Sequence, residues 1–146
     1  MSAAVSYFED LQAGDEGLTP SMTLTQAHAS VYGGLTGDAP DEPGAIPDLL
    51  PLCLLTGLGW RGTRPPLAVR AFMSIDWTIH QALRVGDTIH GVTRVIAKRS
   101  MREGGVLIED YEIVDQRGEI VQRARFVFLV ARRAAAGAAT AETPAP

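Results

Sequence analysis

The sequence has one cysteine and no long hydrophobic segment. Because Cys53 has no second cysteine to pair with, an internal disulfide is excluded, which fits a reducing compartment. No apolar run approaches the ~20 residues that span a bilayer, and the N-terminus lacks the basic start and apolar stretch of a signal peptide. We therefore expect a cytoplasmic protein that does not enter a membrane.

Positive charge is also scarce. The 13 Lys and Arg residues against 17 Asp and Glu residues give a net charge of −4. With no basic run in addition, a nucleic-acid-binding surface is not expected. His28, His80 and His90 are far apart and lack the spacing of metal ligands, so the sequence predicts no zinc site.

The remaining composition is that of an ordinary globular protein. Hydrophobic residues make up 46% of the 146 residues and charged residues 21%, and this length suits one domain rather than two. Residues 134–146 contain no large apolar side chain and cannot bury enough surface to offset their ordering entropy. We expect one domain over residues 1–133 and a disordered tail rich in Ala, Thr and Pro over residues 134–146.

A first helix is predicted near the N-terminus. Thr25 is a good N-cap for a helix that runs to about Leu35. In it Ala27, Val31 and Leu35 recur at the spacing of one apolar stripe. The Pro- and Gly-rich stretch that follows, residues 38–47, predicts a loop.

A second helix is predicted within residues 48–60. No residue between Leu49 and Trp60 is charged. A helix that is apolar on every side must be buried all round, so a sheet is expected to wrap it, with Cys53 as a small core residue.

The rest of the chain has the alternation and turns of strands. They are expected over residues 22–24, 67–79, 89–99, 106–114 and 119–131. Short turns between the long strands indicate an antiparallel meander, and the arrangement belongs to the α+β class, with one curved sheet around one apolar helix. Because a single copy would leave sheet edges and apolar surface exposed, a dimer is expected.

Several segments resemble landmarks of one family, in their order and spacing. They are YFEDLQAGD (residues 7–15), TLT (residues 23–25), GLTGD (residues 34–38), LRVGDT (residues 83–88) and DQRGEIV (residues 115–121). Over most of residues 7–133 the sequence resembles the MaoC-like acyl dehydratases and (R)-specific enoyl-CoA hydratases. The resemblance implies a hot-dog fold, an antiparallel sheet wrapped around a central helix, and dimers with active sites at the subunit interface.

The resemblance also implies a reaction. Its substrates are acyl thioesters, so coenzyme A or the phosphopantetheine of an acyl-carrier protein would be part of the substrate, with no separate cofactor. The typical reaction is reversible hydration of a trans-2-enoyl thioester to the (R)-3-hydroxy form. Asp38 matches the first residue of the family's Asp-x-Asn-Pro-x-His pattern and would be the base, whereas Pro43 stands at the position of the histidine.

The family's second landmark is a His-Gly pair at the start of the central helix, where a backbone N–H polarises the thioester carbonyl. Counting back along the helix puts Pro47 and Asp48 at that pair. Since proline has no N–H, the donor would be Asp48 or Leu49. Tyr32 fits either the wall of the pocket or the core.

Three functions stay open on this basis. The chain is a hydratase or dehydratase with a remodelled site, or a non-catalytic, thioester-binding subunit of a hot-dog dimer, either a homodimer or a heterodimer with a related chain. In the third, an acyl thioesterase, Asp38 directs water at the carbonyl carbon instead of the β-carbon.

Overall fold

The computed structural model describes residues 5–133, so the tail expected over residues 134–146 lies outside the described residues. The elements in chain order are η1 (Phe8–Asp10), β1 (Glu16–Leu18), β2 (Met22–Thr23), α1 (Gln26–Thr36), α2 (Leu50–Leu58), η2 (Gly59–Arg61), β3 (Val69–Ile79), β4 (Thr88–Met101), β5 (Gly104–Val114) and β6 (Ile120–Val130). The four long predicted strands and both predicted helices are present, as is the α+β class.

The strands form one antiparallel sheet in the order β1-β4-β5-β6-β3, with β2 paired to the start of β4. The meander is correct for β4, β5 and β6 but wrong for β3, which pairs with β6. Residues 80–87, between β3 and β4, are too many for a tight two-residue hairpin. They carry the chain from one edge of the long strands to the other side.

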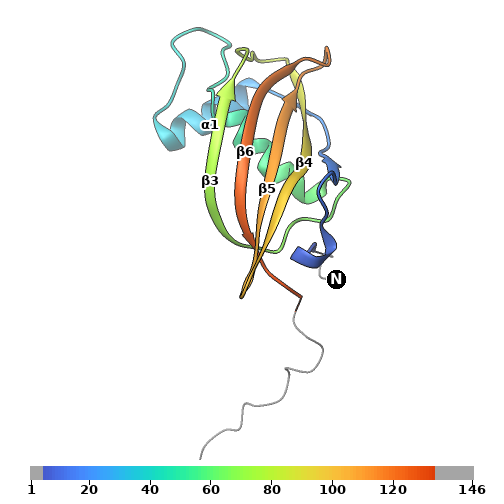
Figure 1. Ribbon diagram of the computed structural model, residues 1–146. Helices are drawn as coiled ribbons and strands as arrows, with labels where there is room; N and C mark the ends of the chain where they lie inside the picture. Colours follow the sequence, from blue (N-terminus) through green and yellow to red (C-terminus); the bar gives the residue numbers. More distant parts are fainter. Residues whose placement is uncertain (1–4, 134–146) are drawn as a thin grey trace, which may run out of the picture.

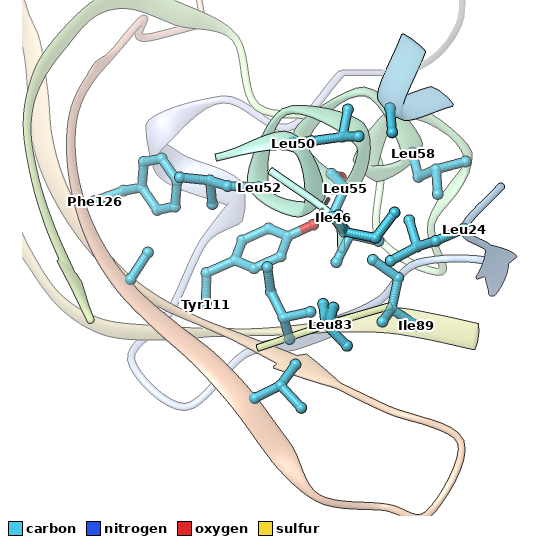
Figure 2. Close-up of a cluster of buried hydrophobic side chains, with 14 residues drawn as sticks. Leu24, Ile46, Leu50, Leu52, Leu55, Leu58, Leu83, Ile89, Tyr111 and Phe126 are labelled. Carbon is cyan, nitrogen blue, oxygen red and sulfur yellow. Dashed lines mark hydrogen bonds between the residues drawn. The ribbon is translucent and has the colours of Figure 1, made fainter. Parts of the chain in front are cut away.

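The sheet curves around α2, which lies against its inner face (Figure 1). The core is a cluster of fully or nearly fully buried side chains, among them Leu50, Leu52, Leu55, Leu58, Tyr111, Ile113, Val121, Ala124 and Phe126. The Tyr111 hydroxyl donates to the Leu55 carbonyl at 2.7 Å, and Figure 2 shows its oxygen pointing at the helix. The predicted wrapping of the apolar helix by the sheet is therefore confirmed.

The prediction that α2 is buried all round is wrong. Leu52 and Leu55 are buried, but Cys53, Thr56 and Gly57 are exposed. The sheet of one copy reaches only one side of the helix, and Cys53 lies on the other side. No helix in the described part of the chain is long and apolar enough to cross a membrane.

The start of α1 is confirmed, but its predicted apolar stripe faces away from the core. The Thr25 side chain caps the helix by accepting from the His28 N–H. Val31 is 63% exposed and Leu35 83% exposed, whereas Ala29 is buried against the core cluster. The helix lies near one end of the sheet (Figure 1), so only a narrow face of it meets the core.

Strand β3 forms one edge of the sheet (Figure 1). It has 11 residues, and within residues 5–133 its outer edge has no partner strand. Large apolar side chains on it are exposed: Val69, Phe72, Met73 and Ile79. A long apolar edge of this kind is a template for pairing with another strand.

Candidate functional site

Asp38 lies directly after α1, with its carboxylate exposed. The chain leaves the helix at Gly37, whose φ of 77° is left-handed and favours glycine. The Asp38 N–H then donates to the Thr36 hydroxyl at 3.1 Å. The loop also folds back over the helix, because a Cβ added at Gly33 would lie 3.3 Å from the Asp38 carbonyl oxygen. This geometry fixes the backbone of the candidate base.

Tyr32 lies in α1, six residues before Asp38. It is partly buried and packs against the core cluster. Burial raises its pKa, and the neighbouring acidic groups of Cys53 and Asp38 raise it further. Asp38 and Cys53 are therefore close enough to Tyr32 to act on its charge, although the sequence analysis had placed Cys53 in the core.

The other two predicted residues form the turn that leads into α2. Leu50 N–H donates to the Pro47 carbonyl at 3.1 Å, and Cys53 N–H to the Leu49 carbonyl at 3.1 Å. Among the described residues, the N–H groups of Asp48 and Leu49 donate no hydrogen bond. Free N–H groups at the start of a helix favour a partial negative charge, and this is what a thioester oxygen needs when it becomes an enolate.

Gln122 is a residue of this region that the sequence analysis missed. It is buried on β6, and its amide donates to the Asp48 carbonyl at 2.9 Å, while its own Oε1 has no partner among the described residues. This hydrogen bond positions the peptide group between Asp48 and Leu49, and the N–H of that group is the Leu49 N–H. The sequence could have indicated that Gln122 is buried. On a strand, residues two and four apart face the same side, so Gln122 faces the core with Ala124 and Phe126.

The loop between the two parts of the site is fixed to the segment before β4. Glu42 forms an ion pair with Arg84, and Ile46 N–H donates to the Leu83 carbonyl at 3.0 Å. Pro43, in this loop, has no group for proton transfer. His28 is engaged at the opposite end of α1 from Asp38, where its Nδ1 accepts from the Thr25 N–H.

No metal site accompanies these groups in the described range. Over residues 5–133, His, Cys, Asp and Glu side chains nowhere gather in threes in a way that would hold an ion. The arrangement offers a carboxylate, backbone N–H donors and the exposed apolar side of α2. Chemically, it can activate water and stabilise an oxyanion.

The sequence matches no protein-family model and no curated protein. Solved structures do match. A monoamine oxidase regulatory protein from Archaeoglobus has a TM-score of 0.79 at 24% identity, over 88% of this chain and 96% of that one. A MaoC-like dehydratase from Rhodospirillum rubrum gives 0.74 at 21% identity, over 88% and 98%. The R-hydratase PhaJ1 from Pseudomonas aeruginosa gives 0.72 at 11% identity, over 96% and 94%.

The chain has the hot-dog fold. A Mycobacterium tuberculosis protein described as a double hot-dog fold is similar over 89% of this chain but 45% of its own length, with a TM-score of 0.72 at 19% identity. A hypothetical thioesterase from Streptococcus pneumoniae, solved with coenzyme A, has a TM-score of 0.55 at 15% identity, over 84% of this chain and 85% of that one. At these identities the likeness establishes the fold and leaves the reaction to be argued from the site.

Proposed function

We propose that this protein is a MaoC-like hydratase or dehydratase that adds water reversibly across the double bond of an enoyl thioester. Two observations carry the proposal: Asp38 is exposed just beyond the end of α1, and at the start of α2 the N–H groups of Asp48 and Leu49 donate no hydrogen bond among the described residues. These are the two functions that hydration requires, a base for water and donors for the enolate oxygen.

In the forward direction Asp38 takes a proton from water, and the hydroxide adds to the β-carbon. The electron pair of the double bond moves toward the thioester carbonyl, and its oxygen becomes an enolate held by the N–H of Leu49 or Asp48. The proton on Asp38 then returns to the α-carbon, which restores the carbonyl and the carboxylate. Because Asp38 both removes the proton from water and returns it to the α-carbon, no step requires the histidine that Pro43 replaces.

The proposed substrate carries its acyl group on coenzyme A or on the phosphopantetheine of an acyl-carrier protein. No separate cofactor takes part, because hydration changes no oxidation state. The proposal is supported by the hydratases and dehydratases among the similar structures and by the neighbour solved with coenzyme A.

We further propose that the protein works in the cytoplasm as a dimer joined along β3, either of two identical chains or with a related hot-dog chain. The exposed apolar side chains of that edge support it, as does the neighbour that carries two hot-dog units in one chain. The exposed and unpaired Cys53 suits a reducing compartment.

Two other functions remain candidates, each favoured by one observation. The likeness to a hypothetical thioesterase favours attack of water on the carbonyl carbon, with release of the thiol. Pro43 at the place of the family's histidine favours a binding subunit whose partner chain does the chemistry.

The test follows crotonyl-CoA with the purified chain, recording the enoyl absorbance and free thiol in one cuvette. A hydratase consumes the enoyl signal without releasing thiol. Thiol release would instead identify a thioesterase, and a chain inert in both signals that gains activity with a co-purified partner would identify a binding subunit.

A further inference from the structure

The residues just before α2 form a tight turn. The Leu50 N–H donates to the Pro47 carbonyl at 3.1 Å. This bond closes a four-residue turn whose central positions are Asp48 and Leu49. Leu49 has a φ of −82° and a ψ of −18°, which are values of the third residue in a type I turn. The central peptide group, which joins Asp48 to Leu49, is therefore in the type I orientation.

This central peptide has one alternative orientation, in which it is turned over. In a type II turn the group is rotated by about half a turn relative to type I, and the third residue needs a positive φ, which glycine adopts readily and leucine does not. In a trans peptide the C=O and the N–H point in opposite directions. Turning over would therefore put the Asp48 carbonyl oxygen where the Leu49 N–H now lies.

A buried glutamine on β6 holds this peptide in its present orientation. The Gln122 side-chain amide donates to the Asp48 carbonyl oxygen at 2.9 Å, and Gln122 is only 2% exposed. The Leu49 N–H lies on the opposite side of the peptide from Gln122. Among the described residues it donates no hydrogen bond, so it is free to bind an oxygen atom of a substrate.

Packing alone does not account for an amide at position 122. Gln122 Oε1 is buried and has no hydrogen-bond partner among the described residues. An unpaired buried acceptor destabilises the folded state, whereas the unbranched apolar side chain of Met would fill the same space without that cost. What the amide contributes is its hydrogen bond to Asp48. Such a bond also polarises the peptide group and makes its N–H a stronger donor.

We propose that Gln122 is a positioning residue for the oxyanion donor: it keeps the Leu49 N–H, and not the Asp48 carbonyl, turned toward the thioester oxygen. A carbonyl oxygen at that place would repel the negative charge that develops on the thioester oxygen, whereas an N–H stabilises it. Gln122 acts through the peptide and not on the substrate, because its side chain is buried on the other side. The inference rests on the oxyanion role proposed above for this turn.

The first test measures the direction of the N–H at position 49 without a substrate. Residual dipolar couplings of the backbone amides are recorded for the full chain, for Gln122→Met and for Gln122→Met/Leu49→Gly, in which glycine also permits the type II turn. We expect the wild-type coupling to fit the direction described above. In the double variant it should change while the couplings of the sheet stay the same. An unchanged coupling at position 49 would overturn the proposal.

The second test measures the effect of this orientation on catalysis. Loss of one oxyanion donor lowers kcat by about 10²–10³-fold. We expect a loss of that size in Gln122→Met/Leu49→Gly and a smaller one in Gln122→Met. KM should change little, because the donor is needed only as charge develops.

Gln81→Met is the matched control for these kinetics. Gln81 is exposed and its amide donates to Glu119, so its loss should leave kcat unchanged. A double variant as fast as this control, in spite of a changed coupling, would overturn the proposal. If the double variant does not fold, the same two readings on Gln122→Met decide, and a kcat equal to that of the control would overturn the proposal.

The two tests separate this proposal from hydration itself. The kinetics use crotonyl-CoA and follow both the enoyl absorbance and free thiol. If the wild type only releases thiol, the proposed hydration fails, but the same losses are expected for thiol release, because its tetrahedral intermediate also carries an oxyanion. If the wild type is inert, the proposed hydration fails and the couplings alone decide whether Gln122 sets the orientation.

Discussion

Asp38 owes its position to the residues just before it. Gly37 ends α1 in a left-handed conformation, and the Thr36 hydroxyl accepts from the Asp38 N–H. The carboxylate is exposed, so it reaches a substrate without the cost of burial. An exposed carboxylate at this position suits a general base.

Replacing this carboxylate by an amide should remove the base and little else. We expect Asp38→Asn to lower kcat for crotonyl-CoA hydration by about a hundred- to ten-thousand-fold, the usual share of a general base, with unchanged stability. Asp41→Asn, at an exposed position of the same loop, is the matched control and should keep full activity. If Asp38→Asn were as active as Asp41→Asn, Asp38 would not be the catalytic base.

Asp115 anchors the turn between β5 and β6. Burial acts to raise its pKa, but backbone N–H groups of Glu119 and Arg117 and the Arg117 guanidinium outweigh it, so the pKa lies below the ordinary value. The Arg117 and Glu119 N–H groups donate to Asp115 Oδ1 at 2.9 and 3.0 Å.

A lowered pKa means that the ionised form stabilises the folded state. The contribution is complete above the unfolded pKa of about 3.9 and is lost as the pH falls through the lower folded value. Urea unfolding from about pH 5 to about pH 2 should show Asp115→Asn less stable at the upper end, with the difference shrinking toward the lower end. A difference that stays constant with pH would exclude this titration.

At the scale of elements, the central packing is that of α2 against the sheet. Leu55 is fully buried at the middle of that contact, and its carbonyl accepts from Tyr111. Leu55→Ala should lower the free energy of unfolding by about 2–5 kcal/mol, through lost apolar burial and the cavity left behind. In Leu35→Ala, at an 83% exposed position of α1, the change should stay within about 0.5 kcal/mol. Urea unfolding of both variants measures this, and equal losses would contradict the packing described.

The sequence was sufficient for the type and approximate range of each long element. Thr25 correctly marked the start of α1, and the uncharged stretch within residues 48–60 correctly predicted α2. It was insufficient for the position of β3 beside β6, because strand pairing depends on contacts that no local pattern records. The sequence also did not indicate that one side of α2 is exposed, because burial there depends on how far the sheet extends.

The candidate site, too, could be predicted only in part from the sequence. Asp38, Asp48 and Leu49 were named from their places in the family's pattern; the structure puts them beside a helix end and a helix start, and their roles stay predictions. The hydrogen bond from Gln122 to the Asp48 carbonyl was not found, because the two residues are 74 apart in the sequence and meet only through the fold.

For the whole molecule, the exposed edge of β3 predicts association. We expect sedimentation to give twice the chain mass of 15.6 kDa. Met73→Lys, which puts a charge on that edge, should shift the protein to the single-chain mass. The control Ile96→Lys, at an exposed apolar position on β4, should leave the mass unchanged. A wild-type protein at the single-chain mass, or equal effects of both variants, would contradict a dimer through β3.

The central claim is that water adds to the β-carbon of an enoyl thioester, and one measurement tests it directly. Crotonyl-CoA is incubated with the protein in water labelled with heavy oxygen, and the products are analysed by mass spectrometry. Hydration by this protein should give an intact thioester with one heavy oxygen on the β-carbon, formed by the wild type and far more slowly by Asp38→Asn. Label in a released carboxylate, or crotonyl-CoA returned unchanged, would contradict it.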